Sequence, residues 1–162
     1  MGKHHREKFT YGVSCKAKVP LEIVHRDLCG PMQTPSLNGN VYFMTFIDDY
    51  SRKTWVYLLK HKSQSFDMFK RFKAMVEKES GEFIKVLILD RRGEYMSKEF
   101  MELCQYYGIK RQFTARYTLN RTIMNMARSM MKEKYLSNEY WGDVFTCSVY
   151  ILNRIPRKSV KD

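Results

Sequence analysis

Apolar and β-forming residues are concentrated in three short runs near the beginning of the chain, and these runs predict strands. Residues 21–27 alternate so that His25 and Asp27 share one face, with Asp27 at the end of the strand, before the Gly30-Pro31 breaker. Residues 41–47 and 54–59 are separated by a polar turn. These last two runs predict an antiparallel hairpin.

Helical and strand patterns alternate through the rest of the chain. A helix is predicted from Ser65, as its N-cap, to Ser80, with Gly81 as the stop and an apolar stripe facing the core. An almost wholly apolar strand follows at 84–89 and ends at Asp90. Further elements are predicted as a helix at 97–107, a strand at 110–114, and helices at 120–134 and 140–153. This order predicts an α/β fold with a mixed sheet flanked by helices.

The length and composition fit one domain with a substantial core, since the chain has 162 residues of which 44% are hydrophobic. We expect residues 1–20 to form a basic N-terminal arm and residues 21–162 to form the domain. Lys and Arg outnumber Asp and Glu by 29 to 17, giving a net charge of +12. This excess favours a polyanionic partner such as nucleic acid, although a basic domain without such a partner stays open.

The cysteines and the N-terminus bear on location. Cys15, Cys29, Cys104 and Cys147 form no CxxC pair, and the basic N-terminus lacks the apolar segment of a signal peptide. The apolar runs are too short and too interrupted by charges for a membrane span. We therefore expect an intracellular protein of the nucleus or cytoplasm, with reduced and mostly buried thiols and no membrane partner.

Two aspartates, Asp27 and Asp90, each close an apolar run. If their strands are parallel neighbours, both carboxylates lie at one edge of the sheet and can share Mg²⁺, which prefers oxygen ligands. A pair of such ions can assist displacement at phosphorus. The alternative is that each aspartate caps a turn, as aspartates commonly do. Spacing alone leaves both interpretations open.

Several motifs together resemble the integrase core of copia-type LTR retrotransposons. The resemblance covers nearly everything from Leu21 to Asp162 and rests on Val24–Met32, Tyr42–Arg52, Trp55–Tyr57, Gly93–Tyr95, Gly108-Ile109, Asn120–Met124, Trp141 and Asn153–Pro156. It implies a ribonuclease H-like fold and a DDE polynucleotidyl transferase, which joins element DNA to target DNA with Mg²⁺ or Mn²⁺ and acts as a multimer. By resemblance, Asp27 and Asp90 match the first and second catalytic, metal-binding aspartates. Residues 2–6 resemble the segment after the family's zinc module.

The chain departs from the family at the third metal-binding carboxylate, a glutamate. It reads Tyr-Thr-Leu-Asn-Arg-Thr over residues 117–122, where both flanks are recognisable but the segment with the glutamate is missing between Thr118 and Asn120. Glu133 and Glu139 align with later parts of the family sequence. Arg91 and Arg92 also follow Asp90, where positive charge competes with a metal ion for the carboxylate. These departures predict weakened metal binding and a catalytically inactive chain.

Basic residues in and before the penultimate predicted helix form a candidate DNA-binding surface. These residues are Arg111, Arg116, Arg121, Arg128 and Lys132. Their phosphate contacts would weaken steeply with salt, whereas the alternative is a solvated helix face. Three interpretations follow: an inactive integrase-core fragment, a non-catalytic DNA-binding or assembly module reused by the host, or a decayed fragment without a selected function. None of them requires a small-molecule substrate. The multimers of the resembled family also imply a homo-oligomer.

Overall fold

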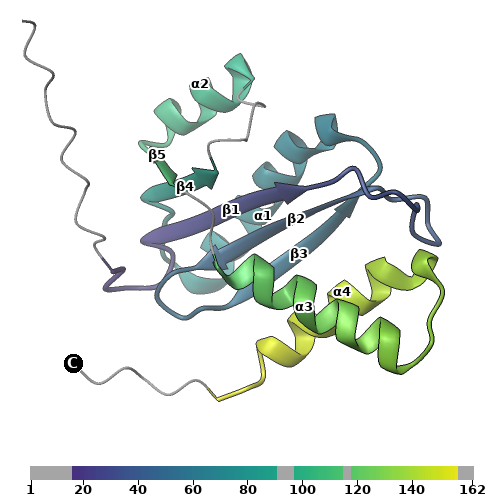
Figure 1. The fold of residues 1–162 in the computed structure, drawn as a ribbon. Helices are drawn as coiled ribbons and strands as arrows, with labels where there is room; N and C mark the ends of the chain where they lie inside the picture. Colours follow the sequence, from purple (N-terminus) through teal and green to yellow (C-terminus); the bar gives the residue numbers. More distant parts are fainter. Residues whose placement is uncertain (1–15, 91–96, 115–117, 157–162) are drawn as a thin grey trace, which may run out of the picture.

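The computed structural model describes residues 16–90, 97–114 and 118–156, and Figure 1 shows their arrangement around one sheet. The side chains of Asp90, Thr114, Thr118 and Leu119 lie outside the described part. The sheet has the strand order β3-β2-β1-β4-β5. Its strands are β1 (Ile23–Cys29), β2 (Tyr42–Asp48), β3 (Thr54–Leu59), β4 (Val86–Asp90) and β5 (Lys110–Thr114). Strands β1, β2 and β3 pair antiparallel, whereas β1, β4 and β5 pair parallel. The predicted hairpin and mixed sheet are therefore confirmed.

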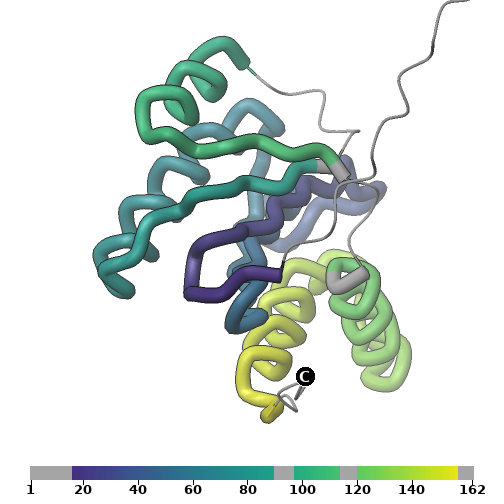
Figure 2. Tube along the Cα trace, turned by 90° about the vertical axis from the view of Figure 1, so that its left-hand side faces the viewer, coloured from purple at the N-terminus to yellow at the C-terminus, as the bar shows by residue number. Residues whose placement is uncertain are grey.

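In the described part of the chain, four helices cover the sheet, two on each face. They are α1 (Ser65–Ser80), α2 (Lys98–Tyr106), α3 (Thr118–Glu133) and α4 (Trp141–Leu152), with 3-10 turns η1 (Lys62–Gln64) and η2 (Asn138–Tyr140) before α1 and α4. Helices α1 and α2 lie on one side of the sheet, and α3 and α4 lie on the other (Figures 1 and 2). Helix α1 ends as predicted, because Gly81 adopts φ 72° and its N–H reaches the carbonyl of Glu77. The N-cap is Gln64, so the prediction of Ser65 at that position was wrong by one residue.

Two cores follow from the alternation of side chains across β2. Phe46 packs toward α1 and stacks on Phe72, with ring centroids 3.9 Å apart. Phe43 points the other way and contacts Phe145 of α4, with centroids 4.5 Å apart. Neighbouring residues of a strand face opposite sides, so a single strand supplies both cores. Both faces of the central sheet are thereby buried.

Strand β1 continues further than predicted, which changes the position of Asp27. The strand ends at Cys29 because Leu28 and Cys29 still pair with β2, and Asp27 lies within it opposite Thr45. Gly30 ends the strand at φ 134°, where a Cβ would meet the Val41 carbonyl oxygen at 2.6 Å. The expectation that Asp27 closes the strand was therefore wrong, although Asp27 and His25 do share a face.

The cysteines are less uniformly buried than predicted. Among the described residues Cys104 is buried, Cys29 is half-buried and Cys147 is exposed, and all three are reduced. Cys15 lies outside the described part. In the described ranges, no helix combines the length and apolar character that crossing a membrane requires.

Candidate functional site

The parallel pairing of β1 with β4 brings the backbones of the two predicted metal-binding aspartates together. Arg26 pairs with Leu89, and the next residue on each strand is Asp27 and Asp90. The two aspartates are therefore at the same level of neighbouring parallel strands, as their spacing suggested. The side chain of Asp90 lies outside the described part, as do Arg91 and Arg92.

The carboxylate of Asp27 contacts the first turn of α3. Asn120 donates a hydrogen bond from Nδ2 to Asp27 Oδ2, and the Thr45 hydroxyl donates to Asn120 Oδ1 over 2.8 Å. The Cys29 thiol lies 3.6 Å from the same Asp27 oxygen and donates to it. Thr45 is fully buried and Asn120 is 5% exposed, so this end of the chain of contacts is shielded from water, whereas Asp27 and Cys29 are half-buried. Asn120 and Thr45 were not identified as site residues from the sequence.

The described donor set does not fit a three-carboxylate metal site. At this point of the fold the described side chains supply one carboxylate, Asp27, and an amide nitrogen faces it. Throughout 16–90, 97–114 and 118–156, no group of three or more His, Cys, Asp or Glu side chains is placed to hold a metal ion. Glu133 lies 13 positions after Asn120 on α3, about 20 Å along the helix axis, and Glu139 lies in η2. Glu133 is therefore too far from Asp27 to replace the missing carboxylate, and neither glutamate belongs to a group of three or more such side chains in the described ranges.

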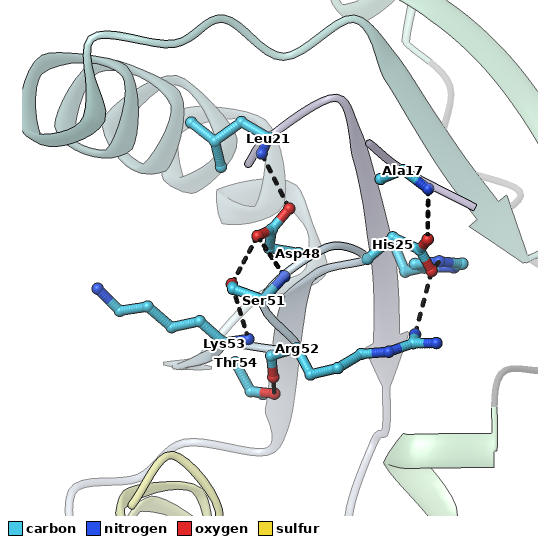
Figure 3. A network of polar contacts seen from close by, with 9 residues as sticks. Ala17, Leu21, His25, Asp48, Ser51, Arg52, Lys53 and Thr54 are labelled. Carbon is cyan, nitrogen blue, oxygen red and sulfur yellow. Dashed lines mark hydrogen bonds and ion pairs between the residues drawn. The ribbon is translucent and has the colours of Figure 1, made fainter. Parts of the chain in front are cut away.

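A second pair of aspartates, Asp48 and Asp49, forms a polar corner after β2 that the sequence did not single out as a site (Figure 3). Asp48 accepts hydrogen bonds from the Leu21 N–H at 2.9 Å and from the Ser51 N–H and hydroxyl at 3.0 and 2.5 Å. It is 1% exposed. These hydrogen bonds connect the segment before β1 to the turn between β2 and β3.

Asp49 completes this corner by contacting three further donors. It accepts the Ala17 N–H, His25 Nε2 and a guanidinium N–H of Arg52, each at 3.0 Å. Burial opposes ionisation of Asp49, but these donors outweigh it and hold the pKa of the carboxyl below its ordinary value. Burial lowers the pKa of His25, and Asp49 offsets part of that effect. The corner is a structural element in which Asp49 is ionised and His25 tends toward its neutral form.

The exposed face of α3 carries a basic stripe, which we define as Arg121, Arg128 and Lys132. All three are exposed, and their spacing of seven and four positions places them on one side of the helix. The opposite side is buried through Ile123 and Ala127, at 0% and 1% exposure. The predicted outward orientation is therefore confirmed.

The other two predicted DNA-binding residues do not join the stripe in the described part. Arg111 is exposed on β5, where its charge acts on the thiol of Cys104 in α2, on the other side of the sheet. Arg116 lies outside the described residues. Among the described residues, the basic stripe is therefore made by α3 alone.

The strand order, with antiparallel β1–β3 and parallel β4 and β5 between two helical layers, defines a ribonuclease H-like α/β fold. The family described as "Integrase core domain" matches residues 17–118, and the chain belongs to this family. It is 43% identical over 164 residues to the retrovirus-related Pol polyprotein from transposon TNT 1-94 of Nicotiana tabacum, and 28% identical over 166 residues to that from transposon RE2 of Arabidopsis thaliana. Both matches cover 96% of the chain, which spans 12% and 11% of those polyproteins.

Solved structures support the same fold. A chain of the cryo-EM structure of the simian T-cell lymphotropic virus intasome, in complex with PP2A regulatory subunit B56 gamma, superposes with a TM-score of 0.63 and 13% identity. The match covers 90% of this chain and 53% of that one. The HTLV-2 integrase catalytic core domain in complex with magnesium, in its dimeric form, gives 0.59 and 18% identity, covering 89% and 94%. At these identities the likeness establishes the fold.

Proposed function

We propose that this chain is the core domain of a copia-type integrase that binds DNA through the basic stripe of α3 and does not carry out strand transfer. The observation that carries the proposal is the arrangement of α3, with Arg121, Arg128 and Lys132 along one exposed side. The opposite side is fixed to the sheet. A rigid helix that presents three cations in a row is suited to contact successive phosphates of a duplex.

The charge balance of α3 favours this use. The helix contains three basic residues and one acidic residue, Glu133, which lies at its last position. No salt bridge of the described residues involves the stripe. The positive charge of these side chains is therefore available to phosphates, and binding should not depend strongly on base sequence.

Strand transfer fails, in this proposal, because the metal-binding carboxylates are incomplete. Asp27 is the one carboxylate that the described side chains place at this point, and Asn120 occupies one of its oxygens. The segment that carries the family's glutamate is missing from the sequence before Asn120. Asp27 and Asp90 then bind Mg²⁺ or Mn²⁺ only weakly, with Arg91 and Arg92 competing for Asp90.

Salt-dependent duplex binding tests the DNA-binding part of the proposal. Fluorescence anisotropy with a short labelled duplex should show binding whose affinity falls steeply as salt rises. Replacing Arg121, Arg128 and Lys132 together by Gln should weaken binding roughly tenfold at low salt and reduce the log–log salt slope by about 2.7. A matched triple change of Arg71, Lys78 and Lys98 to Gln, all exposed on α1 and α2, should leave both nearly unchanged. Equal losses from the two triple variants would contradict a specific role for α3.

Self-association and location complete the proposal. The HTLV-2 core is described in dimeric and trimeric forms, and we extend self-association to this domain, with residues 21–162 as the unit. Light scattering coupled to size-exclusion chromatography measures it directly, and a strictly monomeric chain would contradict it. We also propose that the protein acts inside the cell, in the nucleus or the cytoplasm.

A further inference from the structure

We infer that Asp27, Asn120 and Thr45 form a polar clamp that fixes the first turn of α3 to the sheet without a metal ion. The clamp joins three elements, since Asp27 lies on β1, Thr45 on β2 and Asn120 on α3. Asp27 and Asn120 are 93 positions apart in the chain. In this role Asp27 is a positioning residue for α3, whatever catalysis it once served.

The carboxylate of Asp27 determines how the amide of Asn120 is oriented, because carboxylate oxygens only accept hydrogen bonds whereas the Thr45 hydroxyl can donate or accept. Thr45 Oγ1 donates to Asn120 Oδ1 over 2.8 Å, which leaves Nδ2 to face Asp27 Oδ2. Turning the amide over would place its oxygen against the carboxylate, where two acceptors repel each other unless a cation lies between them. With its nitrogen toward Asp27, the amide itself supplies the positive partner that the carboxylate needs. This orientation requires no metal ion.

Burial makes the clamp important for stability. Thr45 is fully buried and Asn120 is 5% exposed, so water cannot easily replace a lost hydrogen bond at either residue. Ile123 and Ala127 anchor the following turns of α3 through apolar contacts. The clamp holds the beginning of α3 by polar contacts. Because Asn120 directly precedes Arg121, the clamp also positions the first residue of the basic stripe.

The clamp can be reversed between its two partners. If Asp27 becomes Asn and Asn120 becomes Asp, the amide on β1 can donate to the carboxylate on α3. Thr45 then still donates to an oxygen at position 120. The Cys29 thiol gives up its acceptor, because it and Asn120 donate to the same oxygen of Asp27, and that atom becomes the amide nitrogen. The exchange keeps the number of donors, acceptors and charges. Asn120→Asp alone instead brings two carboxylates together, and Asp27→Asn alone removes the charge that strengthens the hydrogen bond.

Thermal unfolding of the full chain in EDTA tests the clamp. We expect Asn120→Asp to lower the Tm by roughly 5 °C, Asp27→Asn to lower it less, and the exchanged pair to return within about 2 °C of the wild type. Asn125→Asp is the matched control, because Asn125 is exposed on the same helix, and it should change the Tm little. If Asn120→Asp does not fold, recovery of folding in the exchanged pair gives the same answer. Additive losses in the exchanged pair would overturn the clamp.

Metal dependence and DNA binding give separate outcomes. The Tm of the wild type should be the same in EDTA and in Mg²⁺. If Mg²⁺ raises the Tm of the wild type but not that of Asp27→Asn, the metal-independent role of Asp27 is overturned. The expected change in affinity for duplex DNA rests on the proposed function. The exchanged pair should recover this affinity together with its Tm. Recovery of the Tm in a chain that binds no DNA would uphold the clamp and reject the proposed function.

Discussion

The polar corner and the polar clamp both centre on aspartates of the sheet, but their carboxylates are satisfied in different ways. At the corner, both oxygens of Asp48 accept hydrogen bonds, and so do both oxygens of Asp49. At the clamp, Asn120 and Cys29 both donate to a single oxygen of Asp27. The hydrogen bonds around each carboxylate therefore distinguish the structural aspartates Asp48 and Asp49 from Asp27, which can take another partner. The position of the residue along its strand does not distinguish them.

The two sites also differ in how far along the chain their partners lie. Asp48 is bound by its close neighbour Ser51 and by Leu21, 27 positions away. Asp27 depends on Asn120, 93 positions away, which reaches it only after α3 has docked on the sheet. We therefore expect the corner to control the stability of the sheet and the clamp to control the attachment of α3.

Removal of the Asp48 carboxylate should have the largest effect on stability. Asp48→Ala leaves the N–H of the buried Leu21 and the N–H of Ser51 without their acceptor and should lower the free energy of unfolding by about 3 kcal/mol. Urea unfolding measures the loss. Asp67→Ala is the control, because that side chain is 70% exposed and pairs only with Lys70, and it should cost less than about 0.5 kcal/mol. Similar losses in the two variants would remove the distinction between the corner and an ordinary surface aspartate.

Replacement of Arg26, beside Asp27, should have a smaller effect of opposite sign. Arg26 is 8% exposed, and burial lowers its pKa, while its neighbours are Met44 Sδ at 3.5 Å and the Phe100 ring at 5.4 Å. A buried charge with such partners is costly, so Arg26→Met should raise the free energy of unfolding by about 1 kcal/mol. Arg71→Met, on the exposed side of α1, is the control and should be near neutral. A clear loss of stability in Arg26→Met would contradict a net cost of burying this cation.

Acidification should weaken the corner by a still smaller amount. Because burial lowers the pKa of His25 from 6.5, the unfolded chain binds a proton before the folded chain does, and stability should fall as the pH drops below about 6.5. Asp49, whose pKa lies below 3.8, adds a further loss only at lower pH, when its carboxylate becomes protonated. The free energy of unfolding is measured by urea unfolding at several pH values between 7.5 and 5, a range chosen around the ordinary histidine pKa. His25→Gln should make this free energy depend less on pH. The exposed His61→Gln should not have this effect, and an unchanged pH dependence in His25→Gln would assign the titration elsewhere.

The sequence predicted those elements whose boundaries are set by nearby residues. The helix at 65–80 was correct because its apolar spacing and Gly81 are local signals, and the β2–β3 hairpin follows from two β-rich runs around a polar turn. The predicted end of β1 was wrong because the true end depends on pairing with β2, which keeps Leu28 and Cys29 in the sheet. A strand boundary that depends on a partner strand cannot be predicted from the apolar residues of that strand alone.

The site shows the same division between local and distant information. The shared level of Asp27 and Asp90 followed from their places on two apolar runs, and the outward face of α3 followed from its periodicity. The hydrogen bond from Asn120 to Asp27 and the separation of Arg111 from the basic stripe depend on how α3 and β5 dock. A polar residue such as Asn120 carries no sequence signal for a partner 93 positions away.

Strand transfer assayed with Mn²⁺ tests most directly whether the retained aspartates still support catalysis. We predict that the wild-type chain gives no joined product from element-end DNA and a target duplex, although it binds the DNA. A variant with the family's glutamate-containing segment restored between Thr118 and Asn120 is the companion sample, since it differs from the wild type only in the missing part. Product from the wild-type chain that disappears in Asp27→Asn would contradict the loss of catalysis, whereas no product above that of Asp27→Asn agrees with it.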